Sequence, residues 1–360
     1  MTDPSPRPHS WRGCFRVEKI LEPPLPPDVE FPRFWSRSPL LSKRSRGRQT
    51  YRALMFRAVY IIGRITFSLG IERAARFARF IGRVGYYFLR AARESALENL
   101  RLSLGDQLTE QERKRIVKEV FSGFTISAVE TMWMSRWKEL FSWLEIEVEG
   151  VEHMENALDQ GHGVIGLCAH FGSWEVFASA SAKMGMPANV VARQQKDPRL
   201  EKWIDSIRTN SGLKMITRGK NPVQMLRCLL RGGLLALLTD LDTRSAEGIF
   251  VDFFGRPAYT PICPFLLARR TGARIIHGLC YREGINRLVF RFSESWEVPR
   301  TEDEEADIRW AVERASKYLE DRIRECPEQW AWFHKRWKTT PEKIRSRSTL
   351  LSDSDEDSQD

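Results

Sequence analysis

From residue 151 onward, short apolar runs alternate with stretches of helical character, and this alternation limits the possible folds more than any other feature of the sequence. The apolar runs are rich in branched side chains and cover residues 163–169, 188–193, 233–240 and 273–281, with helical stretches such as 174–185 and 198–212 between them. A sheet built from such alternation is mostly parallel and carries helices on its faces. The sequence therefore predicts an α/β domain over residues 144–340.

Polar side chains follow three of these apolar runs at the point where each run ends. His170 comes directly after the first run, Arg193 ends the second, and Asp240 and Asp242 close the third. Sites in parallel sheets form at the carboxyl ends of strands, so we expect these side chains to lie at one edge of the sheet. A buried strand that ends by chance in polar residues does not explain polar residues on three strands.

His170 and Glu175 stand five positions apart in the stretch Cys-Ala-His-Phe-Gly-Ser-Trp-Glu. Histidine suits proton abstraction from a hydroxyl, because its ordinary pKa lies close to neutral pH. A carboxylate on the other ring nitrogen would fix the tautomer, and Gly172 allows a turn that brings Glu175 back toward the ring. No serine or cysteine occupies a G-x-S-x-G turn, which argues against a covalent intermediate. Taken alone, the pair also fits a hydrogen-bonded histidine at a strand end.

The chain divides into four parts. Residues 1–49 form an extension rich in Pro, Ser and Arg, which we expect to be flexible although its aromatic residues could dock on the body. Residues 50–143 form a helical part, in which Thr109 and Glu112 have the spacing of a capping box before an amphipathic run. The α/β domain follows over 144–340, and the acidic tail 341–360 is expected to be disordered.

Within the helical part, arginines interrupt the apolar segment 51–92. They stand at seven positions: Arg57, Arg64, Arg73, Arg76, Arg79, Arg83 and Arg90. No stretch reaches the roughly 18 uncharged apolar residues that a spanning helix needs. The recurring spacing of seven lines arginines along one helix face with apolar residues around them, which is typical of a helix lying in a membrane interface. The alternative is a pair of amphipathic helices packed on the domain with solvated arginines.

Composition limits the partners and the compartment. The 360 residues carry a net charge of +10, which favours a polyanionic partner such as nucleic acid, an anionic bilayer or a phosphorylated ligand. The six cysteines are scattered and none forms a C-x-x-C pair, which is typical of a reduced compartment and argues against a zinc site. Residues 1–30 lack the apolar core of a secretory signal.

Several segments resemble, in the same order, those of the lipid A biosynthesis (lauroyl/myristoyl) acyltransferase family. The stretch CAHFGSWE resembles the H-x-x-x-x-D/E box of glycerolipid-type acyltransferases. The other similar segments are 96–113 (ALENLRLSLGDQLTEQER), 190–212 (VVARQQKDPRLEKWIDSIRTNSG), 237–273 (which contains FFGRPAYTP) and 327–339 (PEQWAWFHKRWKT). The resemblance covers about residues 51–340.

The resemblance implies a glycerolipid-acyltransferase-like fold, with a central mostly parallel sheet flanked by helices and an N-terminal helical segment that associates with a membrane. It implies transfer of a fatty acyl chain from a thioester of acyl carrier protein or coenzyme A to a hydroxyl of a membrane glycolipid, first of all a lipid A precursor. By it, His170 is the general base and Glu175 is its carboxylate partner. No cofactor or metal is expected, since the acyl thioester is itself a substrate.

The same resemblance points to residues that would bind substrate. Arg208 stands where the family has a functional arginine, and Asp240 or Asp242 matches its acidic turn, with no choice possible between the two. These aspartates would hold the arginine, or assist His170 if Glu175 points elsewhere.

Further candidates come from neighbouring segments. Arg193 is a possible substrate ligand, and Phe253, Phe254 and Gly255 would form an apolar wall for the acyl chain or belong to the core. His334 stands among three tryptophans (Trp330, Trp332 and Trp337), which invites a second catalytic assignment. We interpret that segment instead as an anchor at the level of lipid headgroups, or as packing.

The resemblance also implies a place and partners. The place is the cytoplasmic face of the bacterial inner membrane, and the partners are acyl carrier protein, a glycolipid acceptor and an anionic membrane surface, without nucleic acid. The family usually begins with a hydrophobic helix, whereas the arginine-broken segment here favours attachment to one leaflet over a single N-terminal anchor. Two alternatives stay open: acylation of another glycolipid such as a phosphatidylinositol mannoside, and a basic membrane- or nucleic-acid-binding protein without catalysis.

Overall fold

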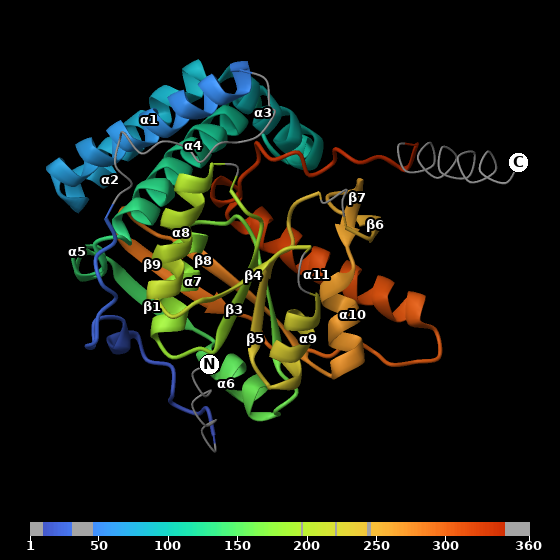
Figure 1. Ribbon diagram of the computed structural model, residues 1–360. Coiled ribbons are helices and arrows are strands. Elements are labelled where there is room, and N and C mark those ends of the chain that lie inside the picture. The colour runs from blue at the N-terminus through green and yellow to red at the C-terminus, as the bar shows by residue number, and fades with distance from the viewer. Residues whose placement is uncertain (1–9, 31–45, 196, 220–221, 243–245, 343–360) are drawn as a thin grey trace, which may run out of the picture.

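The computed structural model describes residues 10–30, 46–195, 197–219, 222–242 and 246–342, and these residues form a layered α/β fold (Figure 1). Seven strands build the central sheet in the order β1-β9-β8-β2-β5-β3-β4. In chain order they are β1 (Glu145–Glu149), β2 (Val164–Cys168), β3 (Ala188–Ala192), β4 (Lys214–Thr217), β5 (Leu234–Leu238), β8 (Arg274–Arg282) and β9 (Arg287–Phe292). Neighbouring strands are parallel except β8 and β9, so the expectation of a mostly parallel sheet is confirmed.

Helices cover both faces of this sheet, because successive strand residues point to opposite sides. In β2, Val164 joins a core with helices α6 to α8, whereas Ile165 joins a core with α9 to α11. The covering helices are α5 (Trp137–Trp143), α6 (Val151–Asp159), α7 (Trp174–Lys183), α8 (Pro198–Asn210), α9 (Pro222–Leu230), α10 (Cys263–Thr271) and α11 (Glu304–Glu325). A two-stranded antiparallel ribbon, β6 (Gly248–Asp252) and β7 (Pro257–Pro261), and three short 3₁₀ turns (Val17–Ile20, Gly105–Gln107 and Pro327–Gln329) complete the described elements.

The N-terminal helices form a separate layer beyond one end of the sheet (Figure 1). They are α1 (Arg46–Leu69), α2 (Ile71–Phe88), α3 (Arg90–Leu104) and α4 (Glu110–Trp133). The predicted capping box starts α4: Thr109 Oγ1 accepts from the Glu112 backbone N–H, and Glu112 Oε2 accepts from the Thr109 backbone N–H at 2.7 Å. A local sequence signal thus fixed the start of the helix that reaches the candidate site.

Helix α2 lies very close to α4 because its buried face carries small residues. Ala74, Ala75 and Ala78 are almost completely buried there. At Gly82 a Cβ atom would come within 2.4 Å of Thr125 Oγ1 and 2.6 Å of the Phe121 carbonyl oxygen. The two helix backbones therefore touch at Gly82, which packs α2 firmly against α4.

The opposite face of α2 is exposed and mixes aromatic side chains with arginines. Phe80, Tyr87 and Phe88 are 61%, 62% and 81% exposed, and the partly exposed arginines Arg76 and Arg83 form ion pairs with Glu72 and with Glu119 of α4. Arg76, Arg83 and Arg90 have the spacing of seven noted above, but Arg90 already belongs to α3, so the three do not line one face of a single helix. Among the residues that the structure describes, no helix is both long and apolar enough to cross a bilayer.

The extension behaves differently from the expectation over residues 10–30. Phe15 and Ile20 are buried in the core, and the Ile20 carbonyl accepts from the Trp137 indole N–H at 2.8 Å. Lys183 donates to the carbonyls of Glu22 and Pro24. This part is therefore packed rather than flexible, because its few apolar side chains find partners on the body; residues 1–9, 31–45 and 343–360, which include most of the acidic tail, lie outside the described residues.

The α2–α4 contact gives a stability prediction with a control on the same helix. Gly82→Ala inserts a methyl group against the α4 backbone and is expected to lower the free energy of unfolding by about 1–3 kcal/mol. Gly85→Ala meets no atom within 3.6 Å and should raise it by about 0.5–1 kcal/mol through helix propensity. Urea unfolding followed by circular dichroism measures both, and equal effects of the two variants would contradict the close contact.

Candidate active site

His170 lies just past the carboxyl end of β2 and is held there by Asp240, which follows β5. The ring nitrogen Nδ1 lies 2.9 Å from Asp240 Oδ1, and the His170 backbone N–H donates to Asp240 Oδ2 at 2.9 Å. The indole N–H of Trp330 donates to the same Oδ2, also at 2.9 Å. Strands β2 and β5 are neighbours in the sheet, so the two residues meet where the strands end, as expected for a parallel sheet.

This contact sets the protonation of both groups. Burial opposes the charge on Asp240, but the charge of His170 and the donated hydrogen bonds hold the pKa of Asp240 at about 2. Burial also lowers the pKa of His170, but the Asp240 carboxylate outweighs it and the pKa lies above the ordinary 6.5. Because an ionised carboxylate only accepts, neutral His170 carries its proton on Nδ1 and leaves the lone pair of Nε2 free.

Glu175 does not contact the His170 ring, and the prediction that it orients the histidine is wrong. Its carboxylate forms a two-bond ion pair with Arg208, with Nε–Oε2 and Nη2–Oε1 distances of 3.0 and 2.5 Å. Glu175 stands in the first turn of α7 and Arg208 in the last turn of α8, where the helix dipoles favour these charges. The guanidinium therefore takes the carboxylate that the spacing had assigned to His170, and the alternative that an aspartate assists His170 holds instead.

The other predicted site residues separate into three groups. Asp242 accepts from the backbone N–H and the hydroxyl of Thr339, at 2.5 and 2.8 Å, so it fixes the C-terminal segment. Arg193 is exposed just after β3. Phe253 and Phe254 are 1% and 4% exposed and pack among tryptophans, and Gly255 forms the turn after them with φ 71°. Of the two interpretations of these three residues, the structure supports the core and not the acyl wall.

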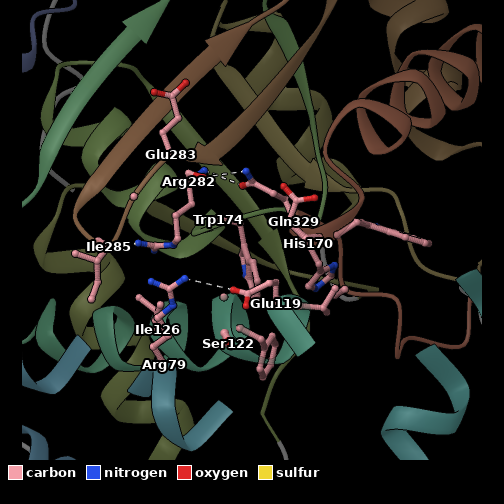
Figure 2. A pocket seen from close by; sticks show the side chains of 18 residues that line it. Arg79, Glu119, Ser122, Ile126, His170, Trp174, Arg282, Glu283, Ile285 and Gln329 are labelled. Carbon is pink, nitrogen blue, oxygen red and sulfur yellow. Dashed lines mark hydrogen bonds and ion pairs between the residues drawn. The ribbon is translucent and has the colours of Figure 1, made fainter. Parts of the chain in front are cut away.

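A cavity of about 320 Å³ opens beside His170 (Figure 2). Its walls come from α2, α4, the turn between β8 and β9 and the segment 328–331. Phe124, Ile126, Trp174, Ile285 and Ala331 make part of the lining apolar, while Arg79, Glu119 and Arg282 add charge. The volume falls at the lower end of the range for small-molecule sites.

The backbone after His170 requires glycine at position 172. Gly172 has φ 55°, and a Cβ there would lie 2.0 Å from the Cys280 carbonyl oxygen of β8. Its N–H donates to the Gln329 carbonyl at 3.0 Å. The chain does turn at Gly172, but the turn does not bring Glu175 to the His170 ring, and the backbone instead approaches strand β8 closely.

Three groups at the site are not among the site residues that the sequence predicts. Glu130 of α4 is fully buried, pairs with Arg282 and accepts from the hydroxyl of Ser173 at 2.6 Å. Trp330 donates to Asp240, and the ring of His334 lies 4.9 Å from that of His170 between centroids. Trp330 and His334 belong to the tryptophan-rich segment, for which the sequence indicates either a lipid anchor or packing. Trp330 and Trp332 are completely buried, which supports packing.

Asp240 and Asp242 can be told apart by the pKa of His170. In Asp240→Asn the carboxylate is lost while burial remains, so the pKa of His170 should fall below its wild-type value, and neutral His170 should persist to lower pH. In Asp242→Asn it should not move, because Asp242 binds Thr339. Nitrogen NMR of the histidine rings, assigned with His170→Ala, measures this, and equal shifts in both variants would refute the assignment.

The Glu175–Arg208 pair predicts a non-additive loss of stability. Glu175→Gln or Arg208→Met alone leaves one buried charge unpaired and should cost about 3–5 kcal/mol of unfolding free energy. The double variant should recover most of this loss, as a double-mutant cycle by urea unfolding will show. The exposed pair Glu72–Arg76 is the control, and Glu72→Gln should change stability little. Purely additive single losses would mean that the two side chains do not depend on each other.

The chain is similar in sequence to several known acyltransferases. The chain is 27% identical over 274 residues to the lipid A biosynthesis lauroyltransferase of Escherichia coli (strain K12), which covers 74% of this chain and 86% of that protein. It is 26% identical to the palmitoleoyltransferase of the same strain, over 72% of this chain and 83% of that protein. A phosphatidylinositol mannoside acyltransferase of Mycobacterium tuberculosis (strain CDC 1551 / Oshkosh) is 26% identical over 41% of this chain and 48% of that protein.

A solved structure, the 1-acyl-sn-glycerophosphate acyltransferase PlsC from Thermotoga maritima, aligns with 68% of this chain and 97% of its own at 13% identity, with a TM-score of 0.32. The sequence model described as "Bacterial lipid A biosynthesis acyltransferase" matches residues 42–339, which is most of the chain. The chain therefore belongs to the bacterial lipid A biosynthesis acyltransferase family, and it is an acyltransferase.

Proposed function

We propose that this enzyme transfers a fatty acyl chain from a thioester of acyl carrier protein or coenzyme A to a hydroxyl of a membrane glycolipid, and that the glycolipid is a lipid A precursor. The observation that carries the proposal is the His170–Asp240 pair beside the cavity. The match to the lipid A acyltransferase family supports the acceptor class. No step in this reaction calls for a metal or a redox cofactor.

The reaction proceeds by direct attack. Nε2 of His170 takes the proton of the acceptor hydroxyl while the hydroxyl oxygen bonds to the thioester carbonyl carbon, and the carbonyl π electrons move to oxygen. The tetrahedral intermediate then collapses, the C–S bond breaks, and the leaving thiolate receives the proton from His170. Asp240 keeps the ring oriented and stabilises the imidazolium between these two steps without taking up the proton.

In our proposal, Glu175 and Arg208 hold the structure around His170 and take no part in the bond changes. Their ion pair links the start of α7, directly after the His170 turn, to the end of α8. Each side chain uses its charge on the other, so we assign the pair to holding the turn in place. We therefore place the family's H-x-x-x-x-E glutamate among the positioning residues of this chain.

The acyl donor and acceptor approach from a membrane surface. The exposed aromatic residues and arginines of α2 suit an interface with anionic lipid, and Arg79 of the same helix lines the cavity. Burial of the acyl chain at about 0.8 kcal/mol per methylene supplies much of the donor affinity. We place the enzyme on the cytoplasmic face of the bacterial inner membrane, bound to one leaflet, where an acidic carrier protein would meet a basic surface.

A second candidate acceptor is a phosphatidylinositol mannoside, which the similarity to the mycobacterial acyltransferase favours. The His170–Asp240 chemistry serves either acceptor equally, since both offer a hydroxyl at a membrane surface.

His170→Ala tests the proposed function directly. Removal of the general base should lower kcat for acyl transfer by about 10²–10⁴-fold. Transfer is measured from lauroyl-carrier protein and from lauroyl-CoA to a lipid A precursor and, separately, to a phosphatidylinositol mannoside. His162→Ala is the control, because His162 is exposed at the opposite end of β2 and should leave the rate unchanged.

Co-sedimentation with anionic vesicles separates catalysis from membrane binding. We expect His170→Ala to bind vesicles as the wild type does. A wild-type transfer rate in His170→Ala would refute the mechanism, and vesicle binding without transfer by the wild type to either acceptor would favour the non-catalytic alternative.

A further inference from the structure

His334 stands beside the reacting histidine and has no role so far. Its ring centroid lies 4.9 Å from that of His170, with an interplanar angle of 57°. The ring centroid of Trp174 lies 5.1 Å from that of His170. With Nδ1 bound to Asp240, Nε2 is the ring nitrogen left for the substrate.

The chain holds His334 in place through its backbone. Asn99 of α3 donates to the carbonyls of Trp332 and His334, at 2.8 and 3.0 Å. The Ala331 N–H donates to the His170 carbonyl at 3.2 Å, which couples the two histidine-bearing segments. Asn99 belongs to the segment ALENLR (residues 96–101), so this segment fixes the loop that carries His334.

Within the described part of the chain, the Nε2 atom of His334 is buried and has no hydrogen-bond partner. A buried polar atom without a partner destabilises the folded state, and a phenylalanine would fill the same space without an unpaired polar atom. Burial, and then the charge of His170, lower the pKa of His334 to about 4, so the ring is neutral at physiological pH. A neutral imidazole with a proton on Nε2 is a hydrogen-bond donor that adds no charge beside His170.

The reaction proposed above creates a negative oxygen next to His170. When the hydroxyl oxygen bonds to the thioester carbon, the carbonyl oxygen gains the electron pair and needs a donor, and donors in a dry site are most effective there. Hydrogen bonds of this kind are often absent in an empty site and form when substrate arrives. A neutral imidazole acting as the electrophile has a precedent in triosephosphate isomerase.

We propose that His334, as its Nε2–H tautomer, donates a hydrogen bond to the oxyanion of the tetrahedral intermediate and is a second catalytic residue of this acyltransferase. The proposal rests on the proposed function. The unpartnered Nε2–H would then form its hydrogen bond only in the transition state. A donor of this kind raises kcat and has little effect on substrate affinity.

Two substitutions test it on the full-length enzyme, with lauroyl-CoA as donor and a lipid A precursor as acceptor. His334→Phe keeps an aromatic ring and removes the donor, so kcat should fall by about 10²–10³-fold with little change in KM. Its melting temperature should equal or exceed that of the wild type, because a buried unpaired nitrogen is lost. His334→Gln places an amide N–H near the Nε2 position and should retain a higher kcat than His334→Phe.

The outcomes are distinct. Wild-type kcat in His334→Phe overturns the proposal, and so does a loss of kcat that comes with a lower melting temperature, since that marks a packing role. Equal kcat in His334→Gln and His334→Phe also overturns it. Failure of the proposed function shows elsewhere, as a wild-type rate in His170→Ala. The acid limb of the pH–rate profile should stay in place in His334→Phe, because it reports His170.

Discussion

The site depends on the hydrogen bonds that the buried carboxylate of Asp240 accepts. Asp240 accepts from the ring and the backbone of His170 and from the indole of Trp330, and its side chain is completely inaccessible. Burial of a carboxylate without hydrogen-bond donors would destabilise the folded state by several kcal/mol, and here three N–H groups offset this loss. The same three bonds join the ends of β2 and β5 to the C-terminal segment, so the contacts that orient the His170 ring also hold that segment on the sheet.

The α/β architecture could be predicted because its signals are local. Branched apolar runs mark the strands, and the carboxyl-edge rule correctly brought His170 and Asp240 together although 70 positions separate them. The same rule could not choose between Asp240 and Asp242, which differ by two positions in one turn. That choice depends on where Thr339 and Trp330 lie, and both belong to a segment about ninety or more positions away.

The assignment of Glu175 failed for a related reason. A spacing of five allows the side chain to return to His170, but it does not say that a guanidinium is nearer. Arg208 arrives from α8 and offers two parallel hydrogen bonds, which a single imidazole nitrogen cannot match. The aromatic content near the C-terminus was equally ambiguous, since it fitted a lipid anchor as well as a packed core. Trp330 and Trp332 are buried, whereas Phe88 of α2 is 81% exposed. Aromatic content alone therefore does not distinguish a buried aromatic cluster from an exposed one.

Three buried or nearly buried carboxylates surround the His170 turn, and their partners decide which of them takes part in proton chemistry. Glu175 pairs with Arg208 and Glu130 pairs with Arg282, so each of these carboxylates is bound to a guanidinium group. Asp240 alone faces a group that gains and loses a proton near neutrality. In the mechanism proposed above, the proton therefore passes through His170, and the two arginine pairs hold the backbone on either side of it in place.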